Sequence, residues 1–280
     1  MYVSLAPDNI GHHELTLPQL IELAVAHGYG GVDPPIDAIM SMPEPQRACD
    51  AVESAGLRWG SFGLPMEFRR DDETATEGLP RVEAMAAAAK AIGCDRCATW
   101  LMPRHDELDY QENFDAHVRR LRPACRILAD HGIRFGIEFV GPLTMRTGHR
   151  YEFVHTMDQA LELAAAIGSD VGLLLDSFHW FTSAATIDDI RRLRSEQIAL
   201  VHVNDGIAGR GPDEQIDNER ALPGETGVID LQGFFGALRE IAYDGPIAVE
   251  PFMQELGDVP ASNAVKRVAD SLRRYGVLSG

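Results

Sequence analysis

Positively charged residues are few in this 280-residue chain. It has 25 Lys and Arg residues and 43 Asp and Glu residues, which give a net charge of −18. Since contacts to phosphates supply most of the affinity for nucleic acid, this balance argues against a nucleic-acid partner. The sequence also lacks any apolar run near the roughly 20 residues of a membrane helix. Its N-terminus has no basic and long apolar signal region, so we expect a cytoplasmic protein without a membrane partner.

Cysteine is scarce as well, with four residues in the chain. Cys94 and Cys97 form a Cys-x-x-Cys, but no second pair of Cys or His stands at zinc-site spacing. A redox motif would open a helix, whereas the preceding Gly93 indicates that a helix has just ended. We therefore predict reduced thiols with a structural role.

The chain alternates short apolar runs with longer amphipathic segments, which is typical of βα units around a parallel sheet. The predicted strands are 2–4, 30–33, 58–62, 96–100, 134–139, 172–175, 199–203 and 247–250. The predicted helices are 18–27, 74–92, 113–131, 157–167, 187–196, 231–243 and 261–275. Left-handed helix stops are expected at Gly28, Gly56, Gly93, Gly132, Gly168 and Gly245. This pattern predicts one α/β domain over residues 1–280, a (β/α)₈ barrel of the usual length of roughly 250 residues.

Four consecutive predicted strands contain, or are followed at once by, a residue that is costly to bury: Glu138, Asp176, His202 and Glu250. In a barrel their side chains would converge above the carboxyl ends of the strands, where functional loops gather. A single Glu at a strand end is more often an ion-pair partner, but three converging carboxylates would repel one another without a cation. Three oxygens and one imidazole suit a divalent ion of the Mn²⁺ type, with Mg²⁺, Co²⁺ and Zn²⁺ left open.

Five segments carry a resemblance to a known family: 136–142, 174–179, 201–205, 249–252 and the loop 217–230. They resemble the xylose isomerase-like sugar isomerase/epimerase TIM barrels, most of all the branch of 2-keto-myo-inositol (inosose) isomerases. Tagatose and psicose 3-epimerases are a more distant match. The resemblance implies that Glu138, Asp176, His202 and Glu250 are metal ligands. It further implies that His179 and Arg220 contact substrate oxygens, and that Glu138 and Glu250 move the substrate's proton.

The expected activity is isomerisation or epimerisation of an unphosphorylated keto-sugar or inosose in carbohydrate metabolism. A metal that polarises a carbonyl stabilises the enediolate formed when a carboxylate removes the neighbouring proton. An alternative on the same scaffold is a lyase or dehydratase, of the dehydroshikimate type or cleaving 3-keto-glycosides. A third acid at the metal, such as His105 or His149, would favour that alternative.

Two other functions fit less well. The spacing of Asp176 and His179 is shared with endonuclease IV-type repair enzymes. Their Asp-x-His pair is missing at Asp217, however, and the net charge of −18 does not suit DNA binding. A sugar or metal sensor would not need both candidate proton-moving carboxylates. The exact substrate, the metal and a homo-oligomeric state stay open.

Several nearby residues have both a functional and a packing interpretation. His179 could pack beside Trp180, and Arg220 could be a surface residue. Asn204 and Asp205 could orient His202 or cap the next segment. The remaining candidates for lining a pocket are Phe62, Trp100 and His12.

Overall fold

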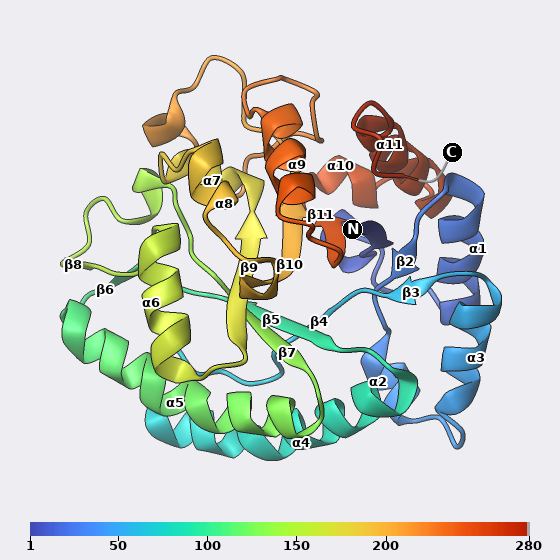
Figure 1. Ribbon diagram of the computed structural model, residues 1–280, viewed down its shortest axis with the longest axis horizontal. Coiled ribbons are helices and arrows are strands. Elements are labelled where there is room, and N and C mark those ends of the chain that lie inside the picture. The colour runs from blue at the N-terminus through green and yellow to red at the C-terminus, as the bar shows by residue number, and fades with distance from the viewer. Residues whose placement is uncertain (279–280) are drawn as a thin grey trace.

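A parallel sheet of nine strands lies at the centre of the computed structural model, which describes residues 1–278 (Figure 1). Its strand order is β3-β2-β1-β11-β10-β9-β7-β5-β4. The strands are β1 Tyr2–Leu5, β2 Gly31–Val32, β3 Arg58–Trp59, β4 Phe62–Gly63, β5 Arg96–Trp100, β7 Arg134–Glu138, β9 Val171–Asp176, β10 Ile198–Val203 and β11 Pro246–Val249. The pairings between these strands are parallel, as the alternation of strands and helices predicted.

The two outermost strands of this order are halves of one predicted strand, 58–62. β3 pairs with β2, whereas β4 pairs with β5, so the segment closes the sheet into a ring. Gly60 and Ser61 form the break, because the backbone N–H of Ser61 donates to the side chain of Asp33 at 3.2 Å rather than to a strand. The predicted (β/α)₈ barrel is therefore confirmed, with its third strand broken in the middle.

Helices surround the barrel, and the two long ones, α4 and α5, run side by side along its lower edge in Figure 1. The helices are α1 Leu17–His27, α2 Ile36–Met40, α3 Gln46–Ser54, α4 Asp72–Ile92, α5 Tyr110–Asp130, α6 Met157–Ile167, α7 Ser177–Thr182, α8 Ile187–Arg191, α9 Leu231–Glu240, α10 Gln254–Gly257 and α11 Ala261–Arg273. Asp71 caps the start of α4, since its side chain accepts the backbone N–H of Thr74 at 2.7 Å. Among residues 1–278, none of the helices has the length and apolar character to span a membrane.

The structure corrects several predicted elements. The helix predicted at 187–196 ends at Arg191, and a short 3-10 turn, Ser195–Gln197, follows it. α2 and α3 were not predicted, because prolines at 35, 43 and 45 interrupt the helical period. An antiparallel hairpin of β6 Arg104–His105 and β8 Tyr151–Glu152 was also missed.

The expected glycine stops are only partly correct. Gly28, Gly56, Gly93 and Gly132 have φ between 71° and 79°, as a left-handed stop requires. Gly168 is extended, with φ 178°, so it does not need the freedom of glycine. Gly245 is not in the left-handed region, and Ala242, with φ 56°, takes that conformation after α9.

The interior of the barrel is filled by apolar side chains, and the cysteines are buried as well. Ala98, Leu174 and Leu200, from β5, β9 and β10, pack together inside the barrel as a small cluster of their own. The four cysteines are buried and free, as expected for structural thiols. The small cluster matters for function because it forms the floor of the cavity described below.

Candidate metal centre

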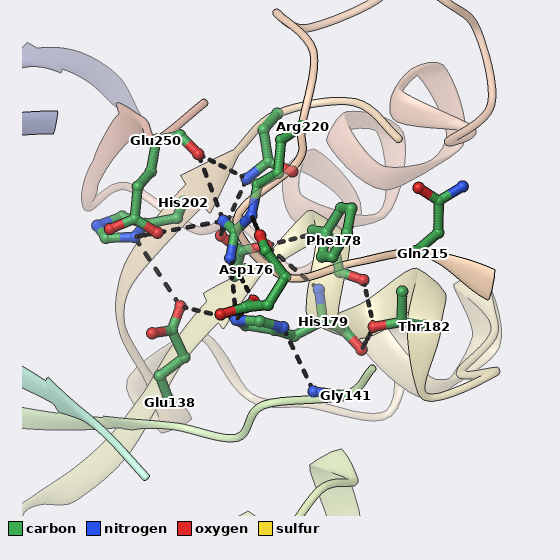
Figure 2. Close-up of polar contacts among 12 residues, drawn as sticks. Glu138, Gly141, Asp176, Phe178, His179, Thr182, His202, Gln215, Arg220 and Glu250 are labelled. Atoms are coloured by element: carbon green, nitrogen blue, oxygen red, sulfur yellow. Dashed lines mark hydrogen bonds and ion pairs between the residues drawn. The ribbon is translucent and has the colours of Figure 1, made fainter. Parts of the chain in front are cut away.

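Four neighbouring strands bring one polar side chain each to the same point. Glu138 ends β7, Asp176 ends β9, His202 lies in β10 and Glu250 follows β11 directly. His202 is in register with Asp176 across the sheet, which sets the two side chains at the same height. One ligand atom from each of the four residues lies within 4.8 Å of those from the other three (Figure 2).

Burial and neighbouring charges shift the pKa values of the two glutamates of this cluster in opposite directions. Burial raises the pKa of Glu138, and the neighbouring carboxylates of Glu250 and Asp176 raise it further. Burial also acts to raise the pKa of Glu250, but His202 and Arg220 outweigh it and hold that pKa below its ordinary value. Burial lowers the pKa of His202, yet the nearby negative charges of Glu250, Asp176 and Asp33 raise it by more. Without a further cation, the proton of Glu138 is therefore held much more tightly than that of Glu250.

Two buried atoms of the cluster have no hydrogen-bond partner among the described residues: Oε1 of Glu138 and Nδ1 of His202. They lie 3.9 Å apart, and Nδ1 of His202 is 3.4 Å from Oε2 of Glu250. Unpaired buried polar atoms are costly and rare in folded proteins. A divalent ion bound by three carboxylates and one imidazole would satisfy both atoms, so the donor set suits such an ion.

Arg220 neutralises part of the cluster from the loop that follows β10. Its Nη1 donates to Oδ2 of Asp176 at 3.1 Å and to Oε2 of Glu250 at 3.2 Å, and its Nη2 donates to Oδ1 of Asp217 at 3.0 Å. The residue is 4% exposed, so these contacts lie out of water. Arg220 is therefore a buried residue with three acidic partners, and the surface interpretation is wrong.

Two aromatic rings hold the Arg220 guanidinium in place. Its central carbon lies 4.7 Å from the ring centre of Phe178 and 4.5 Å from that of Phe252. Phe252 has φ 48°, a left-handed conformation that is uncommon for a bulky residue and is often found near functional sites. The ring of Phe252 is half exposed, so it covers the guanidinium from the solvent side.

His179, on the short helix α7, lies beside the same charges. Its Nε2 is 3.9 Å from Oε1 of Glu138 and 3.3 Å from Nη2 of Arg220, while the backbone N–H of Gly141 approaches Nδ1 at 3.3 Å (Figure 2). Burial lowers the pKa of His179 to about 3, so its ring is neutral near pH 7. His179 is thus a neutral polar group at the edge of the cluster.

The two residues after β10 have different tasks. Nδ2 of Asn204 donates to Oδ2 of Asp176 at 3.1 Å, so Asn204 orients Asp176 and not His202. The carboxylate of Asp205 accepts four backbone N–H groups, those of Gly206, Thr226, Gly227 and Ile229. Asp205 therefore fixes both ends of the loop that carries Arg220.

A cavity of about 1240 Å³ opens beside the cluster. Glu138, His202 and Glu250 lie on its wall, and Ala98, Leu174 and Leu200 form its floor. Asp176, His179 and Arg220 lie behind this wall and are each at most 4% exposed. The cluster thus presents the two glutamates and the imidazole to any molecule in the cavity.

Asp33, which directly follows β2, is an acid in this cavity that was not predicted as a site residue. Its Oδ1 accepts from the hydroxyl of Ser4 at 2.6 Å, and burial raises its pKa to about 6. The position follows the same rule that singled out Glu138: a carboxylate at the end of an apolar strand. Asp217, the partner of Arg220, could not be found this way because it lies in an irregular loop.

The remaining candidates divide clearly. Phe62 and Trp100 line the cavity, and Trp100 is 41% exposed beside Arg69. Nε2 of His12 instead contacts the backbone oxygen of Leu256 at 3.0 Å.

His105 and His149 belong to the β6–β8 region and are engaged there. Nδ1 of His105 accepts the backbone N–H groups of Glu107 and Leu108, at 3.0 and 2.8 Å, and His149 contacts Asp106 at 3.2 Å. Neither histidine lines the cavity. The third-acid role considered for them has no support in this geometry.

Comparison with known proteins shows the same kind of barrel. The family described as xylose isomerase-like TIM barrel matches residues 21–275. An inosose isomerase of Bacillus subtilis is 26% identical over 215 residues, which are 74% of this chain and 73% of that protein. A D-psicose 3-epimerase of Enterocloster bolteae is 25% identical over 206 residues, 72% of this chain and 61% of that protein. A 3-dehydroshikimate dehydratase of Pseudomonas putida is 25% identical over 264 residues, 92% of this chain but 39% of that protein.

Solved structures agree with the fold. A xylose isomerase domain protein from Alicyclobacillus acidocaldarius superposes with a TM-score of 0.83 at 26% identity, over 99% of each chain. A structure of the IOLI protein with a bound zinc atom superposes with a TM-score of 0.81 at 20% identity, over 100% of each chain.

Proposed function

Because the chain belongs to the xylose isomerase-like TIM barrel family, we propose that it is a divalent-metal-dependent isomerase or epimerase of an unphosphorylated keto-sugar or inosose. The observation that carries the proposal is the convergence of Glu138, Asp176, His202 and Glu250 within 4.8 Å of one another, with all but Asp176 lining a cavity. The similar proteins named inosose isomerase and D-psicose 3-epimerase support the substrate class.

In this proposal the four converging residues hold the metal. The unpaired buried atoms of Glu138 and His202 support that assignment, and so does the zinc atom in the similar IOLI structure. Mn²⁺ is the ion we propose, because carboxylate-rich sites with one imidazole suit it, and Mg²⁺, Co²⁺ and Zn²⁺ are the alternatives to be tested. When bound, such an ion polarises a carbonyl and stabilises an enediolate.

Glu138 and Glu250 move the proton in this proposal. They come from β7 and β11, two strands separated in the sheet by β9 and β10, and so approach the cavity from two sides. A carboxylate on either side of a carbon can take a proton from one face and a second can return it to the other.

His179 and Arg220 are the proposed contacts to substrate oxygens. Both provide N–H groups beside Glu138 and Glu250 without lining the cavity in the present conformation. A substrate oxygen could compete for Nη1 or Nη2 of Arg220 with its present acidic partners. His179 is neutral and therefore can donate to a developing oxyanion without carrying charge into the site.

The test is proton exchange between solvent deuterium and candidate substrates, followed by NMR over inososes, ketohexoses, hydroxypyruvate and 3-keto-glycosides. We expect exchange that depends on added metal and is lost in both Glu138→Gln and Glu250→Gln. The matched control is Glu22→Gln, which alters an exposed glutamate on α1 and should leave exchange unchanged. Full activity in either cluster variant would refute the proton-transfer assignment, and activity that is insensitive to EDTA would refute the metal.

A lyase or dehydratase is the second candidate, and Asp33 is the observation that favours it. This partly buried acid, with its pKa raised to about 6, lies in the same cavity and could protonate a leaving group. The similar 3-dehydroshikimate dehydratase supports the possibility. Loss of water or of an alcohol from the substrate, detected by mass spectrometry, distinguishes this reaction from isomerisation, which preserves the mass.

A further inference from the structure

The cavity is larger than a single sugar ring needs. Its volume of about 1240 Å³ exceeds the range of roughly 300–1,000 Å³ that is usual for sites holding drug-sized ligands. The cluster occupies one part of its wall, and the rest extends toward α1 and α2, which lie on the side of the barrel away from α7 in Figure 1. A keto-sugar bound at the cluster would therefore leave much of the cavity unfilled.

Part of the wall toward α1 and α2 is apolar, beside the charged residues described below. We use "annexe" for the part lined by Leu15, Leu17, Ile21, Pro35, Ile36 and Met42. Leu17 and Ile21 are one helical turn apart and so lie on the same face of α1, while Pro35 and Ile36 begin α2. These side chains offer no hydrogen bonds, so sugar hydroxyls placed here would lose their water without gaining a partner.

Charge at the annexe also argues against an anionic occupant. Two basic side chains line this part of the cavity, and each already has an acidic partner. Arg47 pairs with Glu44 at 2.7 Å, and His13 pairs with Asp8 at 3.0 Å. The acids Asp8, Glu14 and Asp37 also lie along this wall and would repel a phosphate or carboxylate. The occupant that suits the annexe is neutral and apolar.

From these observations, and resting on the proposed function, we infer that the substrate is a keto-sugar linked to an apolar or aromatic group, and that this group occupies the annexe. The polar groups of the cavity, the cluster together with Asp33 and Ser61, take the sugar ring. The annexe then selects for the attached group through burial of its apolar surface. An unsubstituted ring is a poorer ligand because it leaves the annexe empty.

The test compares two ligands that differ only in the attached group: phenyl and methyl 3-keto-β-D-glucopyranoside. Calorimetric titration of the metal-loaded protein should show the phenyl compound binding more tightly by on the order of tenfold to a hundredfold, the effect of burying one aromatic ring. Ala38→Trp and Ala51→Trp each place a bulky ring on the cavity wall from an exposed position, and should abolish the difference. Ala26→Trp, also at an exposed helical position but outside the cavity, should preserve it.

Each outcome bears on one inference. Equal binding of the two ligands, no binding of either, or a preference for phenyl that survives both wall substitutions overturns the annexe. Deuterium exchange is followed on the same samples. A binding preference that behaves as expected, without exchange in either ligand, refutes the proposed reaction and leaves the annexe standing.

Discussion

Replacing the buried arginine of the cluster is the perturbation whose effect can be worked out most fully. Arg220→Met keeps the length and apolar packing of the side chain between the rings of Phe178 and Phe252, but removes the charge. Asp176 and Glu250 then lose the guanidinium that lies 3.1 and 3.2 Å from them. In the absence of metal, buried carboxylates face one another with no compensating cation except His202.

The magnitude follows from burial. The Arg220 side chain is 1% exposed and that of Asp176 is 0% exposed, so solvent screens their ion pair very little. Removing one partner of such a pair costs about 3–5 kcal/mol, because the other charge stays buried without compensation. For a chain of this size, 1 kcal/mol shifts the melting temperature by roughly 2–4 °C, so we expect metal-free Arg220→Met to melt about 6–20 °C below the wild type.

Thermal unfolding followed by circular dichroism, with EDTA and then with excess MnCl₂, measures the effect. The added ion supplies the missing positive charge, so it should raise the melting temperature of the variant more than that of the wild type. The control is Arg191→Met, which breaks an exposed pair with Glu240 and should not change the melting temperature measurably. An Arg220→Met variant as stable as the wild type in EDTA would refute the account of the cluster as uncompensated buried charge.

Three further predictions concern residues around the cluster. Asn204→Ala removes the donor to Asp176 and should weaken Mn²⁺ binding by about tenfold to a hundredfold in calorimetric titration, whereas unchanged affinity would show that Asp176 needs no orientation. Asp205→Ala leaves four backbone N–H groups of the 206–229 segment without their acceptor, which should cost about 3 kcal/mol or more and speed proteolysis in that segment. The pKa of Asp33 rises from 3.8 to about 6 on folding, so wild-type stability relative to Asp33→Asn should fall as pH rises from about 4 to about 6, by on the order of 3 kcal/mol. A pH-independent difference in melting temperature between these two proteins would contradict the raised pKa.

The barrel could be predicted because its signals are local. Strands such as β5 and helices such as α6 are bounded by residues that stop or start them within a few positions, and the alternation of the two element types is visible along the chain. α2 and α3 escaped prediction because they are short and prolines at 35, 43 and 45 stand before them, which obscures a helical period. The break at Gly60 and Ser61 depends on a hydrogen bond to Asp33, which is 28 residues from Ser61, and local patterns do not show such a contact.

The same division runs through the candidate site. Glu138, Asp176, His202 and Glu250 stand out in the sequence because a charged or polar group at the end of a buried apolar strand needs a partner. Parallel strands bring their carboxyl ends to one edge, so the sequence and this one rule together determine that the four residues meet. What the sequence does not contain is the distance between side chains that come from different strands and loops.

Tertiary structure alone decided the rest. It placed Arg220 among three acids and two rings, and it directed Asn204 at Asp176 instead of His202. It also gave Glu138 and Glu250 opposite pKa shifts, since burial and neighbouring charges act across space and not along the chain. The size and apolar lining of the cavity depend in the same way on side chains from distant segments. The converging charges can therefore be read from the sequence, whereas the choice of substrate lies in how the loops pack around them.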